Sequence, residues 1–233
     1  MNYLSMVQRL HSEAARQGTT PATVVGATGF NARLVSWIQT AYEDVQSEHE
    51  TWLFRRAEFS EVTVSGTSNY STIVVIPSDW AITDLGAWKV NPNPEELSGV
   101  RLYSAVADEQ DLEYIPWDIF RSTYKFGSFR TQSGRPTIFS IKPDMSMELW
   151  PIPDAVYTVN GEYYMDMQTM TLDADIPILP DYHMAIVWKA LMYYGAFEGA
   201  PEVYAHGQEQ YEKLLSKLEI NQLDKITYGP PLI

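Results

Sequence analysis

The sequence predicts an α+β protein in which helices from both ends of the chain form one bundle and a mainly antiparallel β-domain is inserted between them. Apolar residues recur at helical spacing in four stretches, Asn2–Gln17, Asn31–Glu50, Tyr182–Glu198 and Glu202–Leu223. Between them the period is two residues, and Tyr, Trp, Phe and Pro are frequent. Because the terminal helices must bury their apolar stripes, we expect residues 1–53 and 181–223 in the bundle, 54–180 in the β-domain and 224–233 as an extended tail.

The first two helices are predicted to form an antiparallel pair. Their apolar stripes are Leu4, Val7, Leu10 and Ala14 in the first helix and Leu34, Ile38, Ala41, Tyr42 and Val45 in the second. Gly18 is expected to end the first helix, because glycine adopts the left-handed conformation common at helix C-termini. The turn-rich link Thr19–Gly29 is short enough to favour antiparallel neighbours.

In the middle of the chain, proline and glycine separate short strand candidates. The candidates lie around Phe59, Val62 and Val64 and over Ile73–Ile76, Val100–Tyr103, Thr137–Ile141 and Met147–Trp150. A turn is expected near Ser65–Asn69. Asn91-Pro92-Asn93-Pro94 is predicted to be a loop, because neither proline can donate to a sheet.

Asn160-Gly161 has the composition of a hairpin turn, but the flanking pattern predicts a single long strand. One face would carry Tyr157, Val159, Gly161, Tyr163, Met165 and Met167 without interruption. A two-residue turn would move half of these side chains to the other face, because register fixes the side that each residue occupies.

The C-terminal part is predicted to be a helical hairpin. Asp181 is a candidate N-cap of its first helix. Val187, Ala190, Leu191 and Tyr194 mark the apolar stripe of that helix, and Val203, Tyr211, Leu214, Leu215 and Leu218 mark the stripe of the second. Gly199-Ala200-Pro201 separates the two helices. The apolar tail Ile226–Ile233 contains Pro230-Pro231 and has no periodicity.

Composition excludes several classes of protein. The formal net charge is −14, from 16 Lys and Arg against 30 Asp and Glu, so the chain is not suited to clamp nucleic acid through phosphates. The absence of cysteine excludes disulfides and thiolate chemistry. The chain begins without a signal-peptide pattern, and no apolar run approaches the ~20 residues that span a bilayer. We expect a soluble protein made in the cytoplasm, with no membrane partner.

No reactive centre is recognisable. The histidines His11, His49, His183 and His206 lack metal-ligand spacing and are expected to be surface or interface residues. The carboxylates Asp108, Glu109, Asp111, Asp173 and Asp175 could pair for hydrolysis, but solvated loop charge is the better interpretation in so acidic a chain. No nucleophile elbow, phosphate loop or dinucleotide fingerprint occurs. We therefore expect no catalytic residue, cofactor or metal.

One segment departs from the acidic character of the chain. Between Asp118 and Asp144 there is no acidic residue, while five cations, Arg121, Lys125, Arg130, Arg135 and Lys142, alternate with Phe120, Tyr124, Phe126, Phe129 and Phe139. Three interpretations are open: a short helix and an ordered loop whose aromatics only pack, a protein interface, or a groove for single-stranded nucleic acid. We predict that Arg121, Lys125, Arg130 and Arg135 face an acidic neighbour, either the next subunit or a partner ring. We also predict that the tail docks in extended form on a neighbouring protein through Tyr228, Pro230, Pro231, Leu232 and Ile233; the alternative is that the tail folds back on its own bundle.

The order of several short motifs resembles the head-to-tail adaptor (connector) proteins of tailed bacteriophages. The motifs in the β-region are Gly134-Arg135-Pro136 before a strand, Leu149, Pro151-Ile152-Pro153-Asp154, Tyr157 and Tyr163-Tyr164. They continue with Asp173-Ala174-Asp175-Ile176-Pro177, Leu179-Pro180, His183, Ala185, Ile186, Val187, Ala190, Leu191 and Tyr194. The opening helices and the Trp52-x-Phe54 junction also match. The resemblance covers most of the chain to about Leu223, but neither Asn91–Gly99 nor the tail.

The resemblance implies a helical bundle with an attached β-domain and a structural role in the virion, at the head–tail junction. Such a protein would form a homo-oligomeric ring, with the twelve-fold symmetry of a portal, that binds the portal protein and extends the DNA channel. It would carry tail or nozzle proteins, and duplex DNA would pass through without specific binding. Two alternatives remain: another tail component, or a β-domain that binds or cleaves glycans on exposed tryptophans such as Trp80, Trp88 or Trp117.

Overall fold

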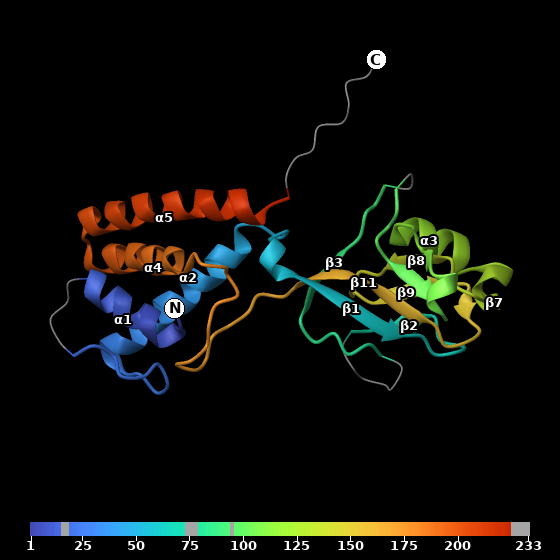
Figure 1. The fold of residues 1–233 in the computed structure, drawn as a ribbon, viewed down its shortest axis with the longest axis horizontal. Coiled ribbons are helices and arrows are strands. Elements are labelled where there is room, and N and C mark those ends of the chain that lie inside the picture. Colours follow the sequence, from blue (N-terminus) through green and yellow to red (C-terminus); the bar gives the residue numbers. More distant parts are fainter. Residues whose placement is uncertain (15–18, 73–78, 94–95, 225–233) are drawn as a thin grey trace, which may run out of the picture. The chain divides into compact units, whose positions relative to one another are not determined.

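The computed structural model describes residues 1–14, 19–72, 79–93 and 96–224, and these form two compact units. The helical unit contains Met1–Arg55 and the chain from Met167 onward, and the β-unit is Arg56–Asp166. The fold is therefore α+β, with N- and C-terminal helices around a central β-region, as predicted (Figure 1). Residues 167–180 precede the last two helices, yet they pack with the helical unit.

In the described part of the helical unit the long helices are α1 (Tyr3–Glu13), α2 (Gly29–Ser47), α4 (His183–Glu198) and α5 (Pro201–Gln222). The single-turn helix η1 (Leu53–Arg55) follows α2. Helix α4 contacts α1, α2 and α5, so helices from both ends of the chain share one core. The core includes the predicted stripe residues Val7, Leu10, Leu34, Ile38 and Leu191, each at most 1% exposed. Burial of each such side chain stabilises the unit by about 1.5–3 kcal/mol relative to exposure.

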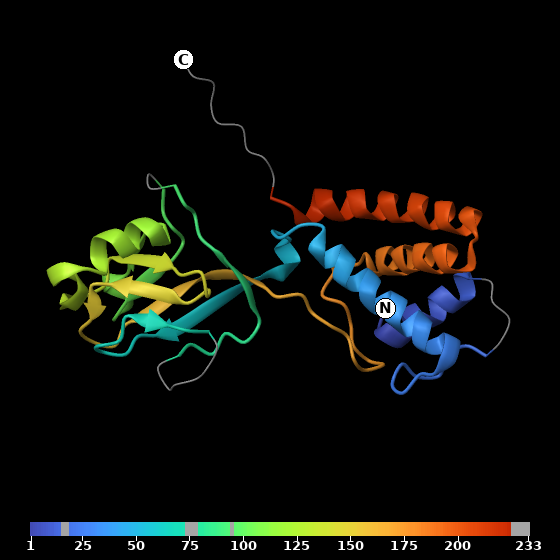
Figure 2. The ribbon, with the colours of Figure 1, turned by 180° about the vertical axis from the view of Figure 1, so that it is seen from behind.

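Helices α4 and α5 lie side by side as a tight hairpin (Figure 1, Figure 2). Gly199 ends α4 in the left-handed conformation, and Pro201 begins α5, as the Gly-Ala-Pro sequence predicted. A Cβ on Gly195 of α4 would lie 2.7 Å from the backbone nitrogen of Tyr204 in α5. The absence of a side chain at Gly195 therefore lets the two backbones approach each other.

Two local predictions about helix ends need correction. The N-cap of α4 is Tyr182, not Asp181, and it makes no side-chain capping bond. Asp181 instead has a φ of 55°. Helix α1 ends at Glu13, and Gly18 lies outside the described residues.

The larger sheet of the β-unit is organised around one long strand, β11 (Thr158–Met165). On one side β11 pairs with β1 (Arg56–Val62), with Phe59 opposite Gly161, and on the other with β3 (Leu85–Lys89) and β4 (Arg101–Tyr103). All these pairs are antiparallel, as is that of β4 with β5 (Gln110–Asp111). The uninterrupted strand through Gly161 is confirmed. A Cβ on Gly161 would lie 2.7 Å from the Phe59 ring, so the glycine makes room for that ring.

A second sheet has the order β2 (Asn69–Tyr70), β9 (Met147–Trp150), β8 (Ile138–Ile141) and β6 (Glu113–Tyr114). The β6–β8 pair is parallel and the other two are antiparallel. A further parallel pair joins β7 (Ser133–Gly134) to β10 (Ile152–Pro153). The predicted strands at β4, β8 and β9 are confirmed, whereas Ile73–Ile76 lies outside the described residues. Asn91–Asn93 is irregular, as expected of a loop.

The β-unit is layered. Phe59, Trp88, Val159 and Tyr163 of the large sheet form one core with Phe139, Met147 and Leu149 of the second sheet. The alternate residues of β8 and β9, which include Glu148 and Trp150, point to the opposite face of the second sheet. Helix α3 (Trp117–Tyr124) and the following 3-10 helix η3 (Gly127–Thr131) cover that face (Figure 1). A further 3-10 helix, η2 (Val106–Asp108), follows β4.

Candidate assembly interface

The first part of the basic aromatic segment forms α3 and η3, a short helix followed by an ordered loop, and its later part contains β7 and β8. Trp117, Phe120 and Tyr124 are spaced at i, i+3 and i+7, which places them on one helix face. That face is buried: Phe120 is fully covered, and the Tyr124 ring packs 4.4 Å, centroid to centroid, from Trp150 of β9. The interpretation in which the aromatics pack is therefore confirmed for these three residues.

Two of the four predicted interface cations have partners within the β-unit. Lys125 Nζ lies 2.5 Å from Oε1 of Glu148, whose side chain is only 3% exposed. The same oxygen accepts a hydrogen bond of 2.6 Å from Ser68 Oγ. Lys125 therefore neutralises a carboxylate beneath α3, and a buried carboxylate without a partner is costly.

Arg135 is the second cation with internal partners. Its Nη1 lies 2.9 Å from Oδ2 of Asp108, and its Nη2 donates to the backbone carbonyls of Leu102 and Asp108. Hydrogen bonds from Ser104 and Ala105, followed by that from Arg135, hold the pKa of Asp108 well below its ordinary value. The guanidinium thus ties the segment before β8 to the loop after β4.

The other two cations, Arg121 and Arg130, are exposed. Among the described residues neither has an ion-pair partner. Three apolar side chains are exposed on the same two helices: Ile119 at 58%, Phe126, just before η3, at 59% and Phe129 at 48%. Arginine and aromatic residues are typical of protein interfaces. The structure thus separates the predicted set into two structural cations and two outward ones.

Sequence reasoning missed part of this layer. Ile119 was not singled out, although its position relative to Trp117, Phe120 and Tyr124 places it off the buried face. Glu148 and Asp108 were not recognised as partners of Lys125 and Arg135, because they belong to distant parts of the chain. No local signal identifies such pairs.

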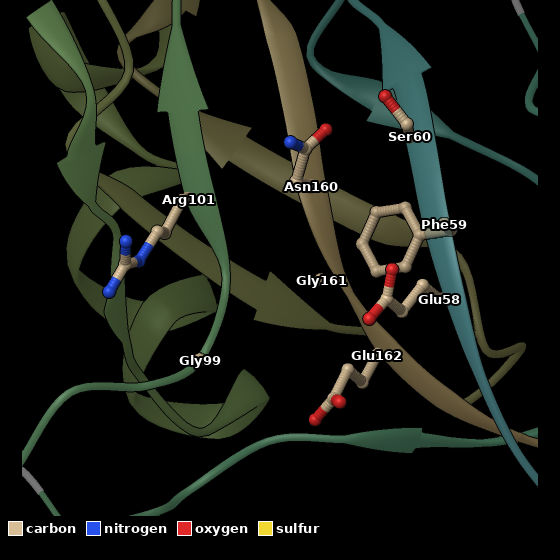
Figure 3. Close-up of a pocket in the computed structure, with 8 residues that line it drawn as sticks. All are labelled: Glu58, Phe59, Ser60, Gly99, Arg101, Asn160, Gly161 and Glu162. Carbon is tan, nitrogen blue, oxygen red and sulfur yellow. The ribbon is translucent and has the colours of Figure 1, made fainter. Parts of the chain in front are cut away.

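The outer face of the large sheet bears a hollow of about 620 Å³ (Figure 3). It lies around Gly161 and is lined by Glu58, Ser60, Arg101, Asn160 and Glu162. Glu58 and Glu162 are directly opposed on β1 and β11, which raises the possibility of a catalytic carboxylate pair. The environment of Glu162 does not favour a role as general acid.

Glu162 is held in ion pairs at 2.5 Å from Arg56 Nη2 and 2.6 Å from Lys89 Nζ. Burial acts to raise the pKa of Glu162, but the hydrogen bonds from Arg56 and Lys89 outweigh it and lower the pKa below its ordinary value. A general acid at neutral pH requires a raised pKa. Glu162 is consequently suited to hold strands β1, β3 and β11 together rather than to donate a proton.

The loop carboxylates and histidines also have structural partners. Asp173 Oδ1 accepts from the backbone N–H of Val24, and Asp111 Oδ2 from that of Ser98. These carboxylates are therefore more than the solvated loop charge expected. His11 is 7% exposed, contrary to the expectation of a surface or interface residue. Among the residues that the structure describes, no His, Asp and Glu side chains are grouped so as to hold a metal ion.

Two of the three tryptophans considered for sugar stacking are not exposed. Trp80 and Trp88 are 1% and 9% exposed and belong to the core of the β-unit, where Trp80 stacks on Tyr70. Expecting them on the surface was wrong, because composition does not reveal which aromatic residues a core buries. Trp117 is half-buried against Phe120.

The predicted tail contact, Tyr228, Pro230, Pro231, Leu232 and Ile233, lies outside the described residues. Within the described ranges no helix combines the length and the apolar character needed to cross a membrane.

Comparison with known proteins gives one family. No curated protein matches the chain. The family model of the SU10 adaptor protein matches residues 1–232, which include both units and their connections. This match agrees with the adaptor resemblance, as do the layered β-unit and the helical unit formed from both chain ends. The chain therefore belongs to the SU10 adaptor protein family, a family of phage adaptor proteins.

Proposed function

We propose that this protein is the head-to-tail adaptor of a tailed phage, a structural virion protein whose copies form a ring beneath the portal. The ring extends the DNA channel, provides the platform for tail or nozzle proteins and has the twelve-fold symmetry of the portal. The single observation that carries this proposal is the family match over residues 1–232. The match includes both the helical unit and the β-unit, so it is not limited to one shared module.

The character of the surface supports a role in assembly. The α3–η3 layer exposes apolar side chains beside two arginines that have no ion-pair partner among the described residues. The two other predicted contact residues act within the β-unit: Lys125 pairs with Glu148 beneath α3, and Arg135 joins the segment before β8 to Asp108. A net charge of −14 suits the wall of a DNA channel, because phosphates are repelled rather than bound.

We also propose that the tail residues Tyr228, Pro230, Pro231, Leu232 and Ile233 dock in extended form on a neighbouring protein such as the portal. A chain end of this composition without periodicity gains order by contact with a partner. Deletion of residues 226–233 is expected to weaken assembly while the far-ultraviolet circular dichroism of the monomer is unchanged. Unchanged assembly would refute the docking.

Cryo-electron microscopy of virions tests the function directly. We expect density for this chain between portal and tail, encircling the path of DNA. The proposal fails if the chain is absent from that junction, or if it lies there without surrounding the channel. Location further along the tail would instead identify it as another tail component.

A further inference from the structure

The outer face of α3 and η3 combines exposed apolar groups with exposed positive charge. We refer to Ile119, Phe126, Phe129 and Arg130 as the basic apolar face. The three apolar side chains are between 48% and 59% exposed. An exposed apolar cluster beside charges without partners is typical of a surface that another protein covers.

A loop of the helical unit has the opposite charge and a similar apolar content. In residues 171–176, the acidic loop, Leu172 and Ile176 are 58% and 67% exposed. They flank Asp173, Ala174 and Asp175, and no ion pair joins the two carboxylates to a cation in the described part of the chain. Hydrogen bonds from the backbone N–H groups of Leu172 and Thr171 lower the pKa of Asp175, which therefore stays ionised at neutral pH.

The acidic loop is held firmly in its conformation. Oδ2 of Asp175 accepts from the N–H groups of Thr171 and Leu172 at 2.6 and 2.8 Å. The N–H of Tyr3 donates to the carbonyl of Asp175 at 2.7 Å, which fixes the loop to the start of α1. A loop that is already ordered loses little conformational entropy when it binds.

We propose that the basic apolar face of one copy of this chain binds the acidic loop of a second copy. Among the described residues, each surface presents bulky apolar side chains beside charges that have no ion-pair partner, and the charges of the two surfaces are of opposite sign. Because the whole chain carries −14, identical copies repel each other, and a local contact between opposite charges offsets that repulsion where the copies meet.

Two different surfaces joined in this way give a head-to-tail contact, which closes into a ring when the rotation between copies allows it. The inference deepens the proposed ring by naming its subunit contact, and in that sense it rests on the proposed function. It makes the α3–η3 layer and the acidic loop the two halves of one interface.

The absence of cysteine makes cross-linking a clean test. Two full-length chains with different affinity tags are prepared, one with Phe129→Cys and one with Ile176→Cys, then mixed and treated with a short bismaleimide. Only a contact between two copies yields a product that carries both tags. Val106→Cys and Ile220→Cys, at positions 84% and 74% exposed, form the matched control pair in the β-unit and the helical unit.

We expect the Phe129→Cys and Ile176→Cys pair to give several-fold more doubly tagged product than the control pair. Adding Arg130→Glu to the first chain should lower that yield about fivefold or more, because one attraction becomes a repulsion. Lys217→Glu, an equal charge change on the exposed side of α5, should have little effect. Yields equal to those of the control pair, or equal losses from both charge reversals, would overturn the contact.

This outcome is distinguishable from failure of the proposed function. A ring seen in virions without the specific cross-link would retain the adaptor role and refute this contact. A specific cross-link in a protein absent from the portal–tail junction would retain the contact and refute the adaptor role.

Discussion

Replacing Lys125 by methionine tests whether α3 is held in place by its ion pair with Glu148. The substitution keeps most of the side-chain volume and removes the charge. The Glu148 side chain is 3% exposed, and without Lys125 the described residues leave its Oε1 a single hydrogen bond, from Ser68. Removing one partner of a buried ion pair costs about 3–5 kcal/mol. The Lys125 side chain is itself 35% exposed, so solvent screens part of the loss, and we expect about 2–3 kcal/mol.

Thermal unfolding followed by calorimetry measures this loss, and hydrogen exchange localises it to the amides of β8 and β9. For a unit of this size, 2–3 kcal/mol corresponds to a fall of roughly 10 °C in Tm. The double variant Lys125→Met/Glu148→Gln should recover most of the stability, because the buried charge is removed with its partner. Arg130→Met, an exposed cation of the same segment, is the control and should change stability by less than about 0.5 kcal/mol.

The reasoning is refuted if Lys125→Met is as stable as Arg130→Met. It is also refuted if Glu148→Gln fails to rescue the variant, because the loss would then come from the methylene contacts of the lysine stem rather than from an unpaired carboxylate.

Three further predictions follow from single contacts. Gly195→Ala should destabilise the helical unit by about 1–3 kcal/mol, because the added Cβ would lie 2.7 Å from the Tyr204 backbone. Gly134→Ala, whose Cβ would have 3.8 Å of clearance, should be tolerated. Equal denaturation midpoints for the two variants would contradict this prediction. Asp175→Asn should reduce the acid sensitivity of the helical unit. The folded-state pKa of Asp175 is lowered, so the stabilisation by its carboxylate is present above the ordinary pKa of 3.8 and is lost as pH falls through the folded pKa. Identical pH profiles of stability for the variant and the wild type would exclude this role of Asp175. Arg135→Glu should lower the stability of the β-unit, because it removes the bonds to Asp108 and to the carbonyl of Leu102. Arg121→Glu should change stability by less than about 0.5 kcal/mol, and chemical denaturation can compare the two variants. Similar losses for both would show that the two arginines do not differ in role.

Periodicity located the helices well, because a helix at a core repeats its apolar contacts along its own sequence. The stripes of α1, α2, α4 and α5 and the uninterrupted strand β11 are local patterns of this kind. The N-cap at Asp181 was wrong although the residue type is favourable, because Asp181 has a φ of 55° and Tyr182 takes the capping position. Residue type alone does not reveal the backbone conformation that the tertiary structure imposes.

The candidate site was predictable as a segment but not as individual residues. An acid-free, arginine- and aromatic-rich stretch is visible in the sequence; its first part forms the α3–η3 layer, and its later part contains strands β7 and β8. Whether a cation of this stretch pairs within the β-unit depends on the acidic residues that the fold brings next to it. Those residues are distant in sequence: Glu148 is 23 residues from Lys125, and Asp108 is 27 residues from Arg135.

The sequence by itself determined the α+β class, the helices at both ends, the continuity of β11 through Gly161 and the lack of cysteine chemistry, because each follows from composition or from a repeat within one element. Tertiary structure alone decided that Trp80 and Trp88 are buried, that Lys125 and Arg135 act within the β-unit, and that Arg121 and Arg130 remain outward. The physical reason is that exposure and charge pairing are properties of contacts between elements distant in sequence, which no local pattern encodes.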